Sequence, residues 1–251
     1  MIVIEKKKIN DIPLLEIACN DKLQTALPTV FFLHGFTSAK EHNLHYAYLL
    51  AEKGFRVILP EAMYHGERNS ELSQTDLAIH FWNIVVQFIH DLETIKTNYE
   101  EKKLLISGKI GVAGTSMGGI TTLGALTQFD WINAAVCLMG SPSYLEFANE
   151  LIKQVQRQGI SLPYTEEHLK EQVASLRKYD LTIQQEKLAN RPLLFWHGKK
   201  DSVVPFHYAY DFYEQAKDNY TVQFIVDAHA DHKVTREALL ATVDWFQKYL
   251  K

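Results

Sequence analysis

The sequence predicts an α/β fold with a mostly parallel central sheet that is flanked by helices on both faces. Short apolar runs alternate along the chain with longer stretches whose apolar residues recur at helical spacing. Several of the short runs are apolar throughout, as expected for strands that are covered on both faces. Because this alternation is typical of strand–helix–strand units, we expect parallel strands joined by crossover helices.

The chain begins with two expected strands, which a turn at Asn10 and Asp11 joins into an antiparallel pair at one edge of the sheet. These two strands cover residues 2–8 and 13–19. Further strands are expected, in order, at residues 29–33, 56–59, 110–113, 134–138, 192–196 and 222–226. Apolar side chains at helical spacing predict helices over residues 44–51, 81–95 and 239–250.

The alternation is interrupted between Ser141 and Arg191, where about fifty residues contain no expected strand; a connection this long usually carries function. Two helices separated by residues 159–163 are expected there. Their apolar positions are Phe147, Leu151, Val155, Leu169, Val173 and Leu176. We therefore predict a single domain over residues 1–251, with residues 143–190 inserted as a helical cap. The alternative is an ordinary surface excursion with two helices.

The composition excludes several classes of protein. Hydrophobic residues make up 47% of the chain and charged residues 22%, which is ordinary for a globular protein. The 26 basic and 30 acidic residues give a net charge of −4, which argues against a nucleic-acid partner. No apolar run approaches the roughly 20 residues of a membrane span, and charge begins at Glu5, so we expect a cytoplasmic protein without a signal peptide. Cys19 and Cys137 are too few for a disulfide framework and are expected in the core.

The strongest chemical signal is the Gly-x-Ser-x-Gly pattern of residues 114–118, which follows an expected strand and precedes a stretch that can form a helix. A turn this tight needs glycine beside the serine, because a Cβ atom would clash there. The turn presents Ser116 above the sheet, at a helix N-terminus whose free N–H groups favour a developing negative charge. We predict that Ser116 is a nucleophile; the alternative is a glycine-rich turn with an inactive serine.

A serine nucleophile needs a base, and the base needs a carboxylate that holds its tautomer. On such a turn the expected order along the chain is serine, then aspartate or glutamate, then histidine. Asp201 directly follows the strand at residues 192–196 and should lie at the carboxyl edge of the sheet with the serine. The candidate bases after the last strand are His229 and His232. Two carboxylates lie too close in sequence to these histidines for easy alignment and rank below Asp201: Asp227 and Asp231.

The oxyanion of an acyl-transfer reaction needs two backbone N–H donors. One should be the N–H of Met117, the residue after the nucleophile. The other should come from the loop after the first parallel strand, which reads His34-Gly35-Phe36-Thr37. We expect Gly35 to allow a close backbone approach and Phe36 to be the second donor, with Thr37 as the open alternative.

These motifs together resemble the α/β-hydrolase family over roughly residues 25–250. Residues 34–36, 114–118 and 197–201 match its oxyanion, nucleophile and acid motifs, and His232 matches its base. The resemblance favours His232 over His229, because His232 directly precedes the C-terminal helix pattern, as the base does in relatives. It also implies the α/β-hydrolase fold.

The loop after the second parallel strand narrows this resemblance. Residues 60–68 look like the corresponding loop of bacterial esterases and prolyl-oligopeptidase-like hydrolases, with Glu61 where an aspartate is common. That departure touches no expected catalytic role. The chain is similar to small bacterial hydrolases related to dienelactone hydrolases and acyl-peptidases.

The residues and the resemblance predict a serine esterase that cleaves small carboxylic esters through an acyl-enzyme. The alternatives are an acyl-peptidase or amidase with the same triad, and a non-catalytic small-molecule binding protein on a hydrolase scaffold; the complete triad argues against the latter. The cap is expected to cover Ser116 and to form the acyl or alcohol pocket. Charged residues along its apolar stripe favour a soluble ester with a short or medium acyl group over a lipid.

Neither a cofactor nor a metal ion is expected. Two histidine pairs have the spacing of metal ligands, but no cysteine or carboxylate cluster completes either pair. These pairs are His42 with His45, and His229 with His232. The Gly-rich phosphate-binding motifs are absent from the sequence. The sequence makes no prediction about the oligomeric state.

Overall fold

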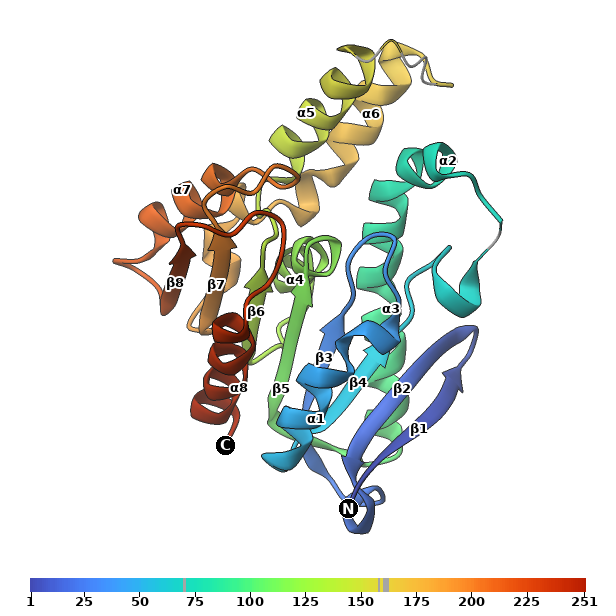
Figure 1. Ribbon diagram of the computed structural model, residues 1–251, viewed down its shortest axis with the longest axis vertical. Coiled ribbons are helices and arrows are strands. Elements are labelled where there is room, and N and C mark those ends of the chain that lie inside the picture. Colours follow the sequence, from blue (N-terminus) through green and yellow to red (C-terminus); the bar gives the residue numbers. More distant parts are fainter. Residues whose placement is uncertain (70, 158, 160–162) are drawn as a thin grey trace.

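The computed structural model describes residues 1–69, 71–157, 159 and 163–251, and its central element is an eight-stranded sheet (Figure 1). The strand order is β1-β2-β4-β3-β5-β6-β7-β8. The strands are β1 (Ile2–Ile9), β2 (Ile12–Cys19), β3 (Leu27–Leu33), β4 (Arg56–Pro60), β5 (Leu105–Thr115), β6 (Ala134–Leu138), β7 (Leu193–Gly198) and β8 (Val222–Asp227). The N-terminal pair is antiparallel and occupies one edge, while β3 to β8 run parallel, so the predicted architecture is confirmed.

Helices cover both faces of this sheet, and the alternation of side chains along the strands shows why. On β3, Phe31 and Leu33 pack into the core under α3, α4 and α7, whereas Val30 and Phe32 pack into the core under α1 and α8. Both pairs are fully buried. The helices are α1 (Leu44–Glu52), α2 (Gln74–Ile79), α3 (Phe81–Glu101), α4 (Met117–Gln128), α5 (Tyr144–Arg157), α6 (Glu166–Ser175), α7 (Phe206–Ala216) and α8 (Arg236–Leu250).

The two helices expected between Ser141 and Arg191 are present as α5 and α6. They lie side by side beyond the carboxyl ends of the parallel strands, and α2 and the start of α3 lie across from them (Figure 1). Short 3-10 turns return the chain to β7. Part of the expected separation at residues 159–163 falls outside the described residues, namely residues 160–162.

In the described part of the chain, none of the helices is both long enough and apolar enough to cross a bilayer.

Candidate active site

Ser116 lies on the sharp turn between β5 and α4, in a backbone conformation that residues other than glycine rarely adopt. Its φ is 53° and its ψ is −117°. The Ser116 N–H donates to the Leu138 carbonyl at 2.9 Å, and the Ser116 carbonyl accepts from the Ile120 N–H at 2.9 Å. The surrounding structure thus holds a strained conformation, as is common where a residue is functional.

The flanking glycines are required by the space around this turn. A Cβ atom on Gly114 would lie 2.3 Å from the backbone of Gly118, and one on Gly118 would lie 2.2 Å from the Leu33 carbonyl oxygen. Neither distance is sterically possible, so larger residues at either position would push α4 away from β3 and β5. The Gly-x-Ser-x-Gly pattern is therefore a packing requirement that places the serine at the carboxyl edge of the sheet.

The structure brings together Ser116, His232 and Asp201. His232 Nε2 lies 2.8 Å from Ser116 Oγ, and His232 Nδ1 lies 2.8 Å from Asp201 Oδ2. In this arrangement the serine hydroxyl donates to Nε2, and the Nδ1–H donates to the carboxylate. His229 is exposed and outside this chain of contacts; its backbone N–H donates to Asp227 Oδ1 at 2.9 Å.

The Asp201 carboxylate is fully buried and receives hydrogen bonds on both oxygens. Oδ1 accepts from the N–H groups of Val203 and Val204 at 2.9 and 2.8 Å. Burial by itself would raise the pKa of Asp201, but the hydrogen bonds from His197, His232 and Val204 hold that pKa well below its usual range. Asp201 therefore stays ionised at neutral pH and can stabilise a positive charge on His232.

His197, the first residue of the acid motif at residues 197–201, also contacts this site. The side chain is buried, and its Nε2 atom lies 3.1 Å from Asp201 Oδ2 and 3.0 Å from the Val204 carbonyl. Asp231, which was ranked below Asp201 as the acid, accepts from the Ser202 N–H at 2.9 Å. This hydrogen bond joins the loop that carries Asp201 to the loop that carries His232. Neither the contact of His197 with Asp201 nor that of Asp231 with Ser202 could be predicted from the spacing of these residues in the sequence.

The loop after β3 was expected to carry the second oxyanion donor, on Phe36 or Thr37. The Thr37 N–H donates to His65 Nε2 at 3.0 Å and is therefore engaged within the protein. This contact favours Phe36, together with Met117 at the first turn of α4. A Cβ atom on Gly35 would lie 3.4 Å from the Thr115 carbonyl oxygen, which is less crowded than at Gly114, so the need for glycine at position 35 stays a prediction.

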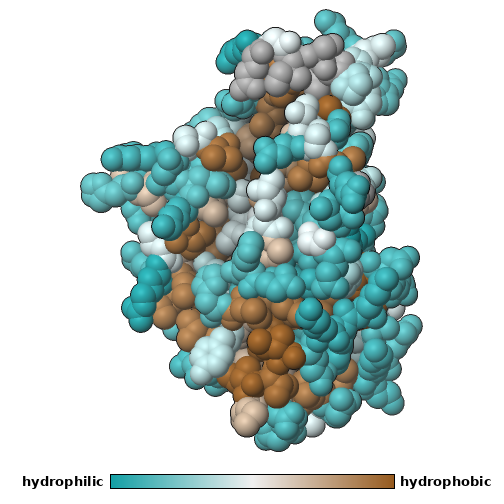
Figure 2. Space-filling view, turned by 45° about the vertical axis from the view of Figure 1, so that its right-hand side comes forward, coloured by the Kyte–Doolittle hydropathy of each residue, from teal (hydrophilic) through white to brown (hydrophobic). Residues whose placement is uncertain are grey.

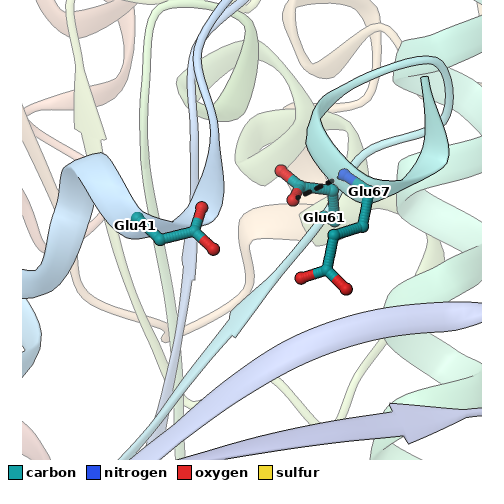
Figure 3. A group of neighbouring side chains, drawn as sticks. All are labelled: Glu41, Glu61 and Glu67. Carbon is teal, nitrogen blue, oxygen red and sulfur yellow. Dashed lines mark hydrogen bonds between the residues drawn. The ribbon is translucent and has the colours of Figure 1, made fainter.

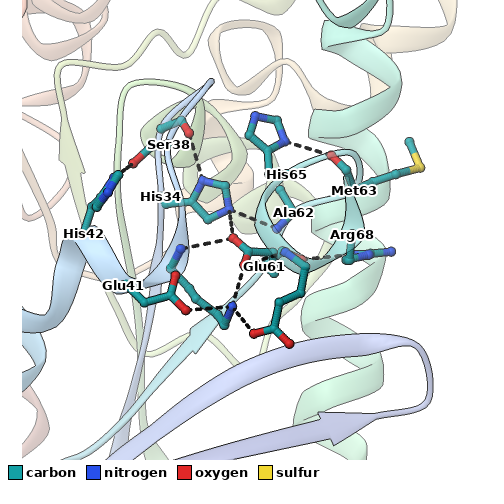
Figure 4. Close-up of polar contacts among 12 residues, drawn as sticks. His34, Ser38, Glu41, His42, Glu61, Ala62, Met63, His65 and Arg68 are labelled. Carbon is teal, nitrogen blue, oxygen red and sulfur yellow. Dashed lines mark hydrogen bonds and ion pairs between the residues drawn. The ribbon is translucent and has the colours of Figure 1, made fainter. Parts of the chain in front are cut away.

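Three carboxylates, from Glu41, Glu61 and Glu67, gather beside this loop with oxygen atoms within 4.8 Å of one another (Figure 3). Such a cluster can attract a cation. The Lys40 ammonium already lies among them, 2.6 Å from Glu61, 2.7 Å from Glu67 and 3.0 Å from Glu41 (Figure 4). The positive charge that the cluster needs is supplied by the protein itself, so the cluster is an ion-pair network.

Glu61 is the buried centre of that network and has a structural role that the sequence did not indicate. Its Oε1 atom accepts from the backbone N–H of Lys40 at 3.1 Å and lies 3.3 Å from His34 Nε2. Burial alone would raise the pKa of the Glu61 carboxyl, but its contacts with His34 and Lys40 lower that pKa to about 2. An ionised Glu61 thus holds the Lys40 end of the loop after β3 (residues 34–40), the expected oxyanion loop, while the Ala62 N–H holds its other end through His34 Nε2.

A cavity of about 710 Å³ lies between α2 and α3 on one side and α5 and α6 on the other. Its apolar lining includes Phe81, Trp82, Leu151, Val155, Leu169 and Val173. Apolar residues are visible in the upper part of the molecule, where these helices face one another (Figure 2). Phe81 also contacts Phe36, with ring centroids 5.5 Å apart. One wall of the cavity therefore borders the oxyanion loop. The wall formed by α2 and α3 was not expected from the sequence.

A serine on a strained strand-to-helix turn, joined through a histidine to a buried aspartate at the edge of this sheet, defines the class of serine hydrolases with the α/β-hydrolase fold. Within that class, the model of the prolyl oligopeptidase family matches residues 41–251. The chain belongs to this family and is a serine hydrolase, and the resemblance seen in the sequence is confirmed.

Proteins similar along their whole length agree with this assignment. YitV of Bacillus subtilis (strain 168), named provisionally as an esterase, is 52% identical over 255 residues, and the match covers 100% of both chains. The esterase YjfP of Escherichia coli (strain K12) is 31% identical over 256 residues, again covering 100% of both. The crystal structure of TT1662 from Thermus thermophilus has a TM-score of 0.79 at 19% identity, covers 100% of this chain and 99% of that one, and shares the fold.

Proposed function

We propose that this serine hydrolase cleaves small carboxylic esters through an acyl-enzyme, with Ser116 as nucleophile, His232 as general base and Asp201 as the residue that orients the base. The observation that carries the proposal is the continuous chain of contacts from Asp201 through His232 to Ser116, with both distances at 2.8 Å. These are the lengths at which a proton can pass from the serine to the imidazole.

The reaction proceeds in two halves. Ser116 Oγ attacks the ester carbonyl carbon while its proton moves to His232 Nε2, and the oxyanion is stabilised by the N–H groups of Phe36 and Met117. The carbonyl re-forms as the C–O bond to the alcohol breaks, and His232 gives its proton to the departing oxygen. A water molecule then attacks the acyl-enzyme, losing its proton to His232, and the acid leaves as Ser116 Oγ recovers that proton.

Residues 143–190 are proposed to act as a cap that forms the acyl or alcohol pocket. Of the apolar positions expected on it, Phe147 and Leu176 are buried in the core, and four half-buried residues line the cavity: Leu151, Val155, Leu169 and Val173. A volume of about 710 Å³ lies within the range of small-molecule sites. Largely apolar walls suit an uncharged substrate group.

The outer surface of the cap favours a soluble substrate. The first turns of α6 expose Glu166, Glu167, Lys170 and Glu171 to water. A hydrolase that works on lipid surfaces would benefit instead from a broad apolar face. The proposed substrate is therefore a soluble ester with a short or medium acyl group, and the predicted cytoplasmic location rests on the sequence alone.

The second candidate is hydrolysis of an acyl-peptide or amide, which the family assignment favours. An amine is a poor leaving group and needs a well-placed acid and a firmly held flanking chain. The names of YitV and YjfP as esterases support the ester. We therefore keep the ester as the proposed substrate and the amide as the outcome that would replace it.

A panel of p-nitrophenyl esters from acetate to palmitate, with aminoacyl anilides alongside, tests the proposal. We expect acetate to octanoate esters to be cleaved faster than palmitate, and anilides more slowly than any ester. Ser116→Ala should lower kcat on every ester by on the order of 10⁶-fold. Anilide turnover equal to that of the best ester would establish the peptidase instead.

A further inference from the structure

The loop after β4, residues 61–68, holds the oxyanion loop through three contacts of backbone N–H groups, of which Figure 4 shows the one between Ala62 and His34. The Ala62 N–H donates to His34 Nε2 at 3.0 Å, and the Lys40 N–H donates to Glu61 Oε1 at 3.1 Å. Between these two contacts, the Thr37 N–H donates to His65 Nε2 at 3.0 Å. The third contact is the one adjacent in sequence to the expected donor Phe36.

The contacts of His65 define one neutral tautomer of its ring. Nδ1 lies 2.8 Å from the Met63 carbonyl oxygen, which can only accept, so Nδ1 carries a hydrogen. Nε2 accepts from the Thr37 N–H and therefore carries none. The ring is buried and packs edge-on against Phe36 with centroids 5.6 Å apart. Nδ1 thus contacts the loop after β4, and Nε2 contacts the loop after β3.

The backbone of Thr37 needs such support. Its φ is 59°, in the left-handed region that costs a residue with a side chain free energy. A conformation of this kind persists only where surrounding contacts hold it. The hydrogen bond to His65 is a contact of this kind, made by the N–H that follows Phe36 in the chain.

We propose that His65 is a positioning residue for the oxyanion loop: its neutral ring holds Thr37, and through Thr37 it fixes the direction of the Phe36 N–H. The inference rests on the proposed function, because it assigns His65 a part in stabilising the oxyanion formed on attack by Ser116. His65 does not touch the reacting atoms and acts only through the backbone.

A pH dependence follows from this geometry. Burial is the largest influence on the pKa of His65 and lowers it, as does the facing His34, with ring centroids 5.2 Å apart; the hydrogen bond to the Met63 carbonyl and the facing carboxylate of Glu61 act in the opposite direction, and the pKa stays below its ordinary value. The ring is therefore neutral at pH 7. As the pH falls, protonation puts a hydrogen on Nε2 that meets the Thr37 N–H, so the loop loses its support. The fall of kcat at acid pH then reflects protonation of His65 in addition to protonation of the general base His232.

The experiment compares His65→Ala, His65→Gln and the matched control His45→Ala, an exposed histidine on α1. On p-nitrophenyl acetate, His65→Ala should lower kcat by on the order of 10- to 100-fold, somewhat less than loss of a whole oxyanion donor, with KM within about twofold. His65→Gln keeps an oxygen that can accept from Thr37 and does not titrate. The His65→Gln variant should therefore recover most of kcat. Its fall in kcat at acid pH should involve one protonation fewer than that of the wild type. His45→Ala should match the wild type.

Two results would overturn the inference: kcat of His65→Ala equal to that of the wild type, or an acid limb of His65→Gln identical to the wild-type limb. If His65→Ala fails to fold, as judged by its thermal melt, the pH profile of His65→Gln decides alone. Failure of the proposed function is seen separately, as retention of ester hydrolysis by Ser116→Ala. A dead Ser116→Ala with a fully active His65→Ala would reject the role of His65 only.

Discussion

The loops around Ser116 and the two cap helices are held in different ways. Around the serine, Asp201 and Glu61 are both buried, and each joins two loops through several hydrogen bonds. In the cap, α6 contributes no buried residue, and α5 contributes only three, which belong to its first turns. Beyond the first turns of α5, the apolar residues of these two helices that line the cavity are half-buried.

This difference separates two tasks. Hydrogen bonds between buried charged groups are directional and fix atoms within narrow limits, which a proton transfer and an oxyanion contact both require. Apolar contacts depend on area and shape and tolerate rearrangement more easily. We therefore expect changes in the buried polar framework to affect turnover and stability, and changes in the cap to affect the choice of substrate.

Among changes that leave Ser116 in place, the largest effect is expected from Asp201→Asn. The amide can place an N–H against His232 Nδ1 and so favours the tautomer that cannot accept the serine proton. The cost in kcat should be on the order of 10⁴-fold, with little change in KM. Steady-state kinetics on p-nitrophenyl acetate measure it, with His229→Ala as a control that should behave as the wild type. An inactive His229→Ala beside an active His232→Ala would show that the wrong histidine was chosen.

The next effect concerns stability and Glu61. Its pKa falls from an ordinary 4.5 to about 2 in the folded protein, so the ionised form stabilises the fold. That contribution is complete above pH 4.5 and is lost as the pH falls toward 2. Glu61→Gln should cost about 3 kcal/mol at pH 7, because it leaves Lys40 without its buried partner.

Thermal unfolding across this pH range measures the contribution of Glu61. The difference in Tm between wild type and Glu61→Gln should shrink as the pH falls below 4.5. Glu67→Gln, at a carboxylate that is 53% exposed, is the matched control and should change Tm far less. A Tm difference that grows toward acid pH would contradict the role given to Glu61.

The smallest effect is expected in the cap. Leu169→Trp adds bulk to the cavity wall and should raise KM for the octanoate ester by roughly tenfold, since filling a pocket by a few carbon atoms costs on the order of 1–3 kcal/mol. Turnover of the acetate ester should stay within about twofold of the wild type, because the polar framework is untouched. Lys170→Trp, one residue away on the exposed side of α6, is the control. If both variants had the same effect on KM, or if neither had an effect, the cavity would not be the site that binds the acyl group.

The features that the sequence predicted are those that depend on patterns local in the chain. Apolar runs and helical spacing predicted the parallel sheet and its helices, because a strand buried on both faces is apolar throughout and a helix buried on one face has apolar residues at a regular spacing. Motif order placed Ser116, Asp201 and His232 on one edge. The contacts of His65 and Glu61 span 28 and 21 residues and depend on how two loops meet, which no local period records. The α2 wall of the cavity was missed for a similar reason, since a six-residue helix carries little periodic signal.

The central claim is that Ser116 is the nucleophile of this hydrolase, and covalent labelling tests it most directly. The wild-type protein is treated with a fluorophosphonate, which reacts with serines that an adjacent base activates, and the labelled peptide is mapped by mass spectrometry. We predict a single adduct on Ser116, formed in step with the loss of ester hydrolysis and absent from Ser116→Ala. An adduct on another residue, or ester hydrolysis that survives complete labelling of Ser116, would contradict the account.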